Sequence, residues 1–126
     1  MEAILARDGS PALRRARVAA RVAADNRGRD IVLLDLRELT CMFDFFLLVN
    51  GASRRQLHAI AEEIDNVFEK ELGDKRLGQE GYDESHWILL DYGDLVVHMF
   101  EPETRAYYAL EELWAQAKRV PVEEIS

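Results

Sequence analysis

Cysteine is nearly missing from this chain of 126 residues, which contains only Cys41. A single cysteine excludes an internal disulfide and fits a reducing compartment. Long apolar runs are missing too, because none reaches the roughly eighteen residues of a membrane-spanning helix. The N-terminal residues also lack a basic segment followed by an apolar stretch, so we expect no secretory signal. Together these absences indicate a cytoplasmic protein without a membrane span.

Residues that bind metals or act as nucleophiles are also scarce. The three histidines are His58, His86 and His98, and none has a second ligand at a recognised spacing, so we expect no metal and no cofactor. Ser53 is explained as a helix cap, and Cys41 has no adjacent base that the sequence reveals. We therefore expect no catalytic residues, and a protein that is not an enzyme.

Basic residues are scarce outside the first quarter of the chain. The formal net charge is −8, but residues 1–30 hold seven arginines and four acidic residues, a net of +3, which leaves −11 for the other 96 residues. An acidic body disfavours contact with nucleic acid and favours a basic partner. An RNA-binding module would therefore have to use Arg14, Arg15, Arg17 and Arg21. A solvated helix face, or a surface complementary to the acidic body of a second copy, explains these arginines as well.

The hydrophobic pattern predicts one domain of alternating strands and helices. Hydrophobic residues make up 48% and charged residues 32%, which is ordinary for a globular domain. Strands are expected at 31–35, 44–50, 75–80, 87–91 and 95–100, and helices at 11–26, 53–72 and 102–117. This order predicts an α/β fold, a mixed five-stranded sheet with flanking helices. The domain spans 1–126, with a core at 10–117 and a C-terminal tail at 118–126.

The helix starts carry the clearest local signals. Ser10-Pro11 is typical of a helix start, and Ser53 with Gln56 forms a capping box. The first helix has only a narrow, weakly apolar stripe, so we expect it to pack loosely or against a partner. The eight residues between the first two strands are too few for a helical crossover, which predicts an antiparallel pair.

A phosphate-binding turn is an alternative at Gly51-Ala52-Ser53, where a helix begins after a strand. A nucleotidyltransferase-like enzyme would start its active site with such a turn. It would also need carboxylates on neighbouring strands to hold magnesium, and no Asp-x-Asp pair follows on the next strand. The metal-binding half of such a site is missing.

The segment from Trp87 to Trp114 is the most informative part of the chain. Its two strands are apolar on both faces and are joined by a tight turn at Tyr92-Gly93-Asp94. Such a hairpin must be covered on both sides, by helices of this chain or by another macromolecule. Six of the eleven aromatic residues lie here, five of them Trp or Tyr, and Trp and Tyr dominate binding hot spots. This concentration favours an interaction surface.

The same segment resembles the ribosomal silencing factor family, RsfS, also called Iojap. The family signature is a Glu-Gly pair, a variable loop, then Trp-x-Leu-Leu-Asp-Tyr-Gly-Asp-x-Val-Val-His-x-Phe, matched here by Glu80-Gly81 and residues 87–100. A second motif, Arg-x-Tyr-Tyr-x-Leu-Glu-x-Leu-Trp, is matched from Arg105 to Trp114. The Asp-Phe-Phe strand and its Gly-x-Ser-x-x-Gln turn occupy 44–56. The resemblance covers about residues 10–117.

This resemblance implies a function without catalysis. Family members bind the large ribosomal subunit through ribosomal protein L-fourteen, block joining of the small subunit and repress translation when nutrients are scarce. They have a nucleotidyltransferase-like topology without the metal-binding acids, and homodimers are common. Direct contact with RNA would be minor. Carried onto this sequence, the expected contact residues are Trp87, Leu90, Tyr92 and Asp94, with His98, Arg105, Tyr108 and Glu111 as further candidates.

Overall fold

A six-stranded mixed sheet forms the centre of the molecule. The computed structural model describes residues 10–84 and 86–121. The strands are β1 (Arg29–Asp35), β2 (Phe45–Asn50), β3 (Gly78–Glu80), β4 (Trp87–Asp91), β5 (Leu95–Phe100) and β6 (Lys118–Val120). Their order across the sheet is β3-β4-β5-β2-β1-β6, and only β2 and β5 are parallel. The α/β fold with a mixed sheet is confirmed, and so is the antiparallel pairing of β1 with β2.

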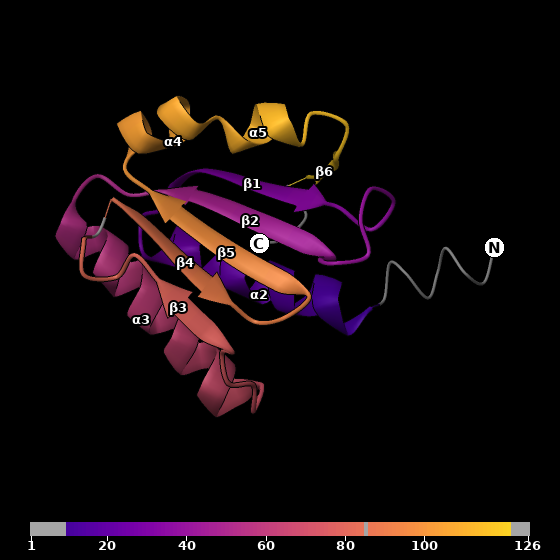
Figure 1. The fold of residues 1–126 in the computed structure, drawn as a ribbon. Helices are drawn as coiled ribbons and strands as arrows, with labels where there is room; N and C mark the ends of the chain where they lie inside the picture. Colours follow the sequence, from indigo (N-terminus) through magenta and orange to yellow (C-terminus); the bar gives the residue numbers. More distant parts are fainter. Residues whose placement is uncertain (1–9, 85, 122–126) are drawn as a thin grey trace.

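Helices lie on both faces of this sheet. Figure 1 shows α2 (Pro11–Asp25) and α3 (Arg54–Glu71) behind it, and α4 (Pro102–Tyr108) and α5 (Leu110–Leu113) next to β1. Leu110 of α5 and the following Trp114 pack against the cluster on the opposite face. Each face therefore has its own core: a large one under α2 and α3 and a smaller one towards α4 and α5. No helix among the described residues is long and apolar enough to span a bilayer.

Helix α2 packs tightly on the sheet, which corrects the expectation of a loose helix. Ser10 caps it by accepting a hydrogen bond from the backbone N–H of Leu13 at 3.1 Å. Its buried face consists of Ala12, Leu13, Ala16, Ala19, Ala20, Val22 and Ala23. Alanine side chains are small, so this helix approaches the sheet closely and buries a wide face even though its side chains are short.

The C-terminal part of the chain differs from the prediction in two ways. The expected single helix from Pro102 to about residue 117 breaks at Ala109, whose φ of 47° and ψ of 48° are left-handed. Tyr107 at the end of α4 and Leu113 at the end of α5 are 81% and 72% exposed. The expected tail begins with β6, which pairs with β1 through Leu33–Val120 and adds the sixth strand. Residues 122–126 of that tail lie outside the described residues.

Candidate partner-binding site

Alternation along β4 decides which of its side chains reach the outside. Ile88 and Leu90 are fully buried in the large core under α2 and α3. Trp87 and Leu89 point to the opposite face and remain half-buried, as does Asp91. Tyr108 of α4 packs on Trp87, yet Trp87 and Leu89 both keep part of their surface exposed. The face is therefore covered only in part by the chain itself.

An aromatic cluster covers this partly open face, and we call it the aromatic face. It consists of Phe46, Trp87, His98, Phe100, Tyr108 and Trp114. The Trp87 ring centroid lies 4.8 Å from that of Tyr108 and 5.0 Å from that of Phe100. Tyr108 is 54% exposed, whereas Phe46 and Phe100 are buried. Tyr108 is thus the most exposed aromatic side chain of the cluster, and Trp87 and Trp114 are half-buried.

His98 is the polar member of the aromatic face and holds Trp87 in place. The indole Nε1 of Trp87 donates a hydrogen bond to His98 Nδ1 at 3.1 Å. Burial lowers the pKa of His98 to about 3, so its ring is neutral at physiological pH. Because Nδ1 accepts, the proton of the neutral ring sits on Nε2, which is buried without a hydrogen-bond partner among the described residues. His98 therefore orients Trp87 and is not itself exposed to a partner.

Arg105 connects α4 by hydrogen bonds to the start of β1 and the end of β2. Its Nη1 donates to the carbonyl of Asp30 and to Asn50 Oδ1, the latter at 2.9 Å, and its Nε donates to Glu111 Oε1 at 2.8 Å. The hydrogen bond from Arg105 lowers the pKa of Glu111, although partial burial opposes that shift. Arg105 is 8% exposed, so this network positions the two short helices and leaves little of the guanidinium for a partner.

Leu90 and Tyr92, two expected contact residues, are instead buried in the large core. Leu90 has no exposed surface and Tyr92 has 4%. The Tyr92 hydroxyl donates to Asp65 Oδ1 on α3 at 3.0 Å, and its ring packs on Phe68 with centroids 4.5 Å apart. Burial is the main cause that raises the pKa of Tyr92. Leu90 is buried because side chains alternate along a strand. Leu89 therefore shares the face of Trp87, and Leu90 points to the other face.

Asp94 also has a structural role in the turn between β4 and β5. It forms an ion pair with Arg15 of α2, whose other guanidinium nitrogen binds Asp74 at 2.9 Å. Its backbone carbonyl accepts from the N–H groups of Asp44 and Phe45. These contacts hold α2 to the hairpin, and they also neutralise one arginine that was considered for contact with RNA.

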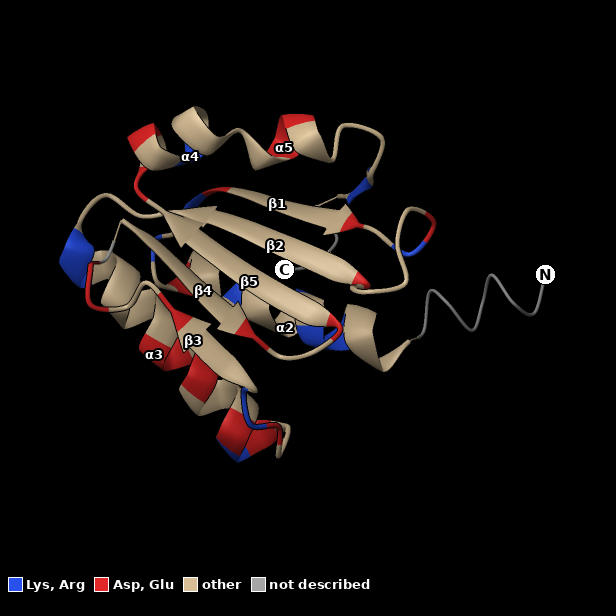
Figure 2. Ribbon diagram, in the orientation of Figure 1, with Lys and Arg blue, Asp and Glu red and all other residues tan. Residues whose placement is uncertain are grey.

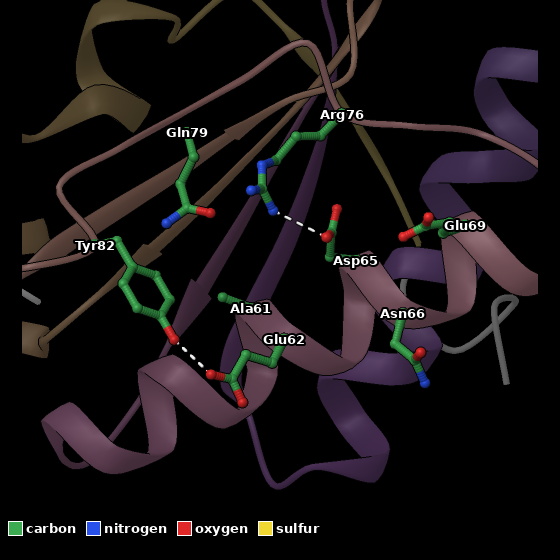
Figure 3. A pocket seen from close by; sticks show the side chains of 8 residues that line it. All are labelled: Ala61, Glu62, Asp65, Asn66, Glu69, Arg76, Gln79 and Tyr82. Carbon is green, nitrogen blue, oxygen red and sulfur yellow. Dashed lines mark hydrogen bonds and ion pairs between the residues drawn. The ribbon is translucent and has the colours of Figure 1, made fainter.

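A polar cleft of about 430 Å³ lies between α3 and the loop that follows β3 (Figure 3). Its charged groups largely satisfy one another: Arg76 pairs with Asp65 at 2.9 Å, and the Tyr82 hydroxyl donates to Glu62 at 2.5 Å. That hydrogen bond, followed by burial, raises the pKa of Tyr82. Within the described residues no group of three or more His, Cys, Asp or Glu is arranged to hold a metal ion. The cleft therefore lacks the donor set of a nucleotidyltransferase site.

The turn at Gly51-Ala52-Ser53 uses its backbone donors within the chain. Gly51 N–H donates to the carbonyl of Phe100 at 2.9 Å, and Ala52 N–H donates to Gln56 Oε1 at 2.6 Å. Gln56 N–H in turn donates to Ser53 Oγ at 3.1 Å, which is the serine half of the expected capping box. The reciprocal bond differs from the expected one, because the Gln56 side chain accepts from Ala52 and not from Ser53. With these donors satisfied, the turn offers fewer free N–H groups to a phosphate than the sequence pattern indicates.

The fold and this face together define an α/β protein with an open mixed sheet and a partly covered aromatic surface. The chain belongs to the RsfS family, whose model, described as ribosomal silencing factor during starvation, matches residues 9–126. It is 42% identical over 102 residues to the ribosomal silencing factor RsfS of Bacillus subtilis, covering 80% of this chain and 85% of that protein.

Two further comparisons agree with this membership. A crystal structure of protein CV0518 from Chromobacterium violaceum superposes with a TM-score of 0.79 at 36% identity, covering 84% of this chain and 88% of that one. A mouse protein named mitochondrial assembly of ribosomal large subunit protein 1 is 34% identical over 88 residues. Those residues cover 68% of this chain and 39% of the mouse protein. The names of these relatives connect the family with ribosomes.

Proposed function

We propose that this protein is a cytoplasmic translation repressor that binds the large ribosomal subunit. It contacts ribosomal protein L-fourteen, blocks joining of the small subunit and acts above all under nutrient limitation. Family membership supports a ribosomal role, and the name of the mouse relative points to the large subunit. Blocking a subunit face requires only tight occupancy and bulk, so the proposal needs no catalytic residue. The homodimer that the resemblance implies stays a prediction.

The partly open aromatic face is the observation that supports this proposal most directly. Trp87 and Leu89 are half-buried on β4, and Tyr108 is more than half exposed beside them. An apolar surface with Trp and Tyr at its centre is the composition that binding hot spots favour. We therefore propose Trp87, Leu89 and Tyr108 as the side chains that meet L-fourteen, with Leu89 in place of Leu90.

Three other expected residues support the contact surface indirectly. His98 and Arg105 are almost fully buried, and they hold Trp87 and Glu111. Glu111 remains partly exposed and negatively charged. Glu111 pairs with Arg105 at 2.8 Å and with Arg119 at 3.5 Å, so it supports the contact surface through these ion pairs.

Sedimentation of purified ribosomal subunits tests this function. With the protein present, it should migrate with the large subunit, and the fraction of assembled ribosomes should fall. The small subunit alone serves as the control and should not carry the protein. Migration with neither subunit, or undiminished assembly at saturating protein, would contradict the proposed function.

A further inference from the structure

Four exposed arginines lie near the end of the sheet where Asn50 of β2 pairs with Phe100 of β5. They are Arg27 and Arg29, in the turn after α2 and at the start of β1, and Arg54 and Arg55, in the first turn of α3. We call these four residues the arginine patch. The start of α3 is visible as a blue end, and red bands follow along the same helix (Figure 2). The patch therefore lies beside the acidic part of α3.

Hydrogen bonds and strand pairing bring the segments of the patch together. The side-chain Nε2 of Gln56, which follows Arg55, donates to the carbonyls of Asn26 and Arg27 at 3.3 and 2.8 Å. Arg29 is paired across the strands with Asn50, the last residue of β2 before the turn into α3. The same end of the sheet thus carries arginines from two segments far apart in sequence.

The charges of the patch are not used within the fold. Within residues 10–84 and 86–121, Arg27, Arg29 and Arg55 form no ion pair with another side chain. Arg54 donates to the carbonyl of Asp83 at 2.7 Å, an interaction that leaves its charge unpaired. Arg15, by contrast, is neutralised by Asp74 and Asp94.

The position of two of these arginines is also unfavourable for the isolated helix. The N-terminus of a helix carries partial positive charge and favours acidic side chains there. The first turn of α3 has no acidic residue and instead contains Arg54 and Arg55. Two acidic residues lie close by in sequence: Asp25 is exposed, and Asp30 accepts a hydrogen bond from Asn50 at 3.2 Å. The four arginines outnumber these two aspartates, and Asp83, whose carbonyl accepts from Arg54, is a third acidic residue beside the patch.

We propose that the arginine patch binds RNA phosphates of the large subunit while the aromatic face binds protein. This inference rests on the proposed binding to that subunit. Guanidinium groups bind phosphate oxygens bidentately, and each phosphate that is bound releases counterions, which makes binding salt-dependent. Arg15, one of the arginines of α2 that were considered for contact with RNA, is instead paired with two carboxylates.

The test uses two double variants, R27Q/R29Q and R54Q/R55Q, and the matched control K70Q/K75Q, which removes two exposed positive charges near the other end of α3. Large-subunit affinity is measured over a series of salt concentrations. Both patch variants should bind more weakly than wild type. The slope of log affinity against log salt should fall by about one for each phosphate group that the variant no longer binds. The control should keep the wild-type slope.

A second titration, with a duplex RNA oligomer at low salt, separates this inference from the proposed function. RNA binding that depends on the patch supports the inference even if large subunits are not bound, a result that would reject the proposed function alone. Unchanged salt slopes in both patch variants would overturn the inference while leaving subunit binding intact. A changed slope on subunits without patch-dependent RNA binding would assign the patch to an acidic protein surface and would also overturn it.

Discussion

His98 of the aromatic face is buried and has an ionisable ring, so it makes the stability of the fold depend on pH. Its folded pKa is about 3, against an ordinary value of 6.5. Between these values the unfolded chain binds more protons than the folded one, so the free energy of unfolding falls as the pH falls. Stability is therefore highest above the unfolded pKa and declines on acidification.

Removing the titrating ring should flatten this acid sensitivity. For wild type, we expect His98 alone to lower the free energy of unfolding by about 2 kcal/mol between about pH 7 and about pH 5. His98→Gln should lack this component in urea unfolding measured at both pH values. His86→Gln, at an exposed histidine, is the matched control and should keep the wild-type difference. Equal pH dependence in wild type and His98→Gln would contradict the buried, neutral ring.

Single contact residues were only partly predictable from the sequence. The family motif predicted both Trp87 and Leu90 as contact residues. Strand alternation instead places Leu89 on the face of Trp87 and buries Leu90. That signal was present in the sequence, because side chains two positions apart share a face. The burial of Arg105 was not readable, since it depends on Asp30 and Asn50, which meet it only in the folded chain.

Element boundaries were most predictable where apolar strands are bounded by turn residues. The expected limits of β4 and β5 coincide with the observed ones, since Gly93, at φ 91°, adopts the left-handed geometry of the turn between them. The break between α4 and α5 was missed because no Gly or Pro marks it. β6 was missed because three residues with two basic side chains form a strand only through pairing with distant β1.

Replacing the left-handed residue between α4 and α5 by glycine should stabilise the fold, although glycine usually destabilises a helical segment. Ala109 has a steric cost of about 1–2 kcal/mol in this conformation, whereas glycine adopts it freely. Ala109→Gly should therefore raise the free energy of unfolding by about 1 kcal/mol. Ala106→Gly, at an exposed position inside α4, is the control and should lower it by a similar amount. Urea unfolding of both variants checks this, and destabilisation by Ala109→Gly would contradict a left-handed Ala109.

At the scale of the whole molecule, the two sheet faces differ in how the chain covers them. Helices α2 and α3 close one face completely, with the small side chains of α2 bringing that helix close to the strands. The short α4 and α5 cover only part of the other (Figure 1). The sequence predicted that both faces need cover, because both strands of the hairpin are apolar throughout. The sequence did not predict which face would stay open. That depends on the break at Ala109 and on how closely α2 approaches the sheet, and no local sequence pattern marks either feature.

The open part of the aromatic face leads to a comparison between two leucines. Leu89 lies on that face, whereas Leu77 is 75% exposed in the segment before β3, outside the aromatic cluster. Leu89→Ala should weaken binding to large subunits roughly fivefold or more, the effect of removing about 1 kcal/mol or more at a hot spot. Leu77→Ala removes the same atoms from an exposed site and should bind like wild type.

Binding and folding must be separated in this comparison, because Leu89 also packs against the smaller core. Circular dichroism and thermal unfolding establish that both variants are folded at the temperature of the binding assay. Sedimentation with large subunits then gives the two affinities. Equal affinities for folded Leu89→Ala and Leu77→Ala would remove β4 from the contact surface, whereas selective weakening in Leu89→Ala would place the subunit on the face that α4 and α5 leave open.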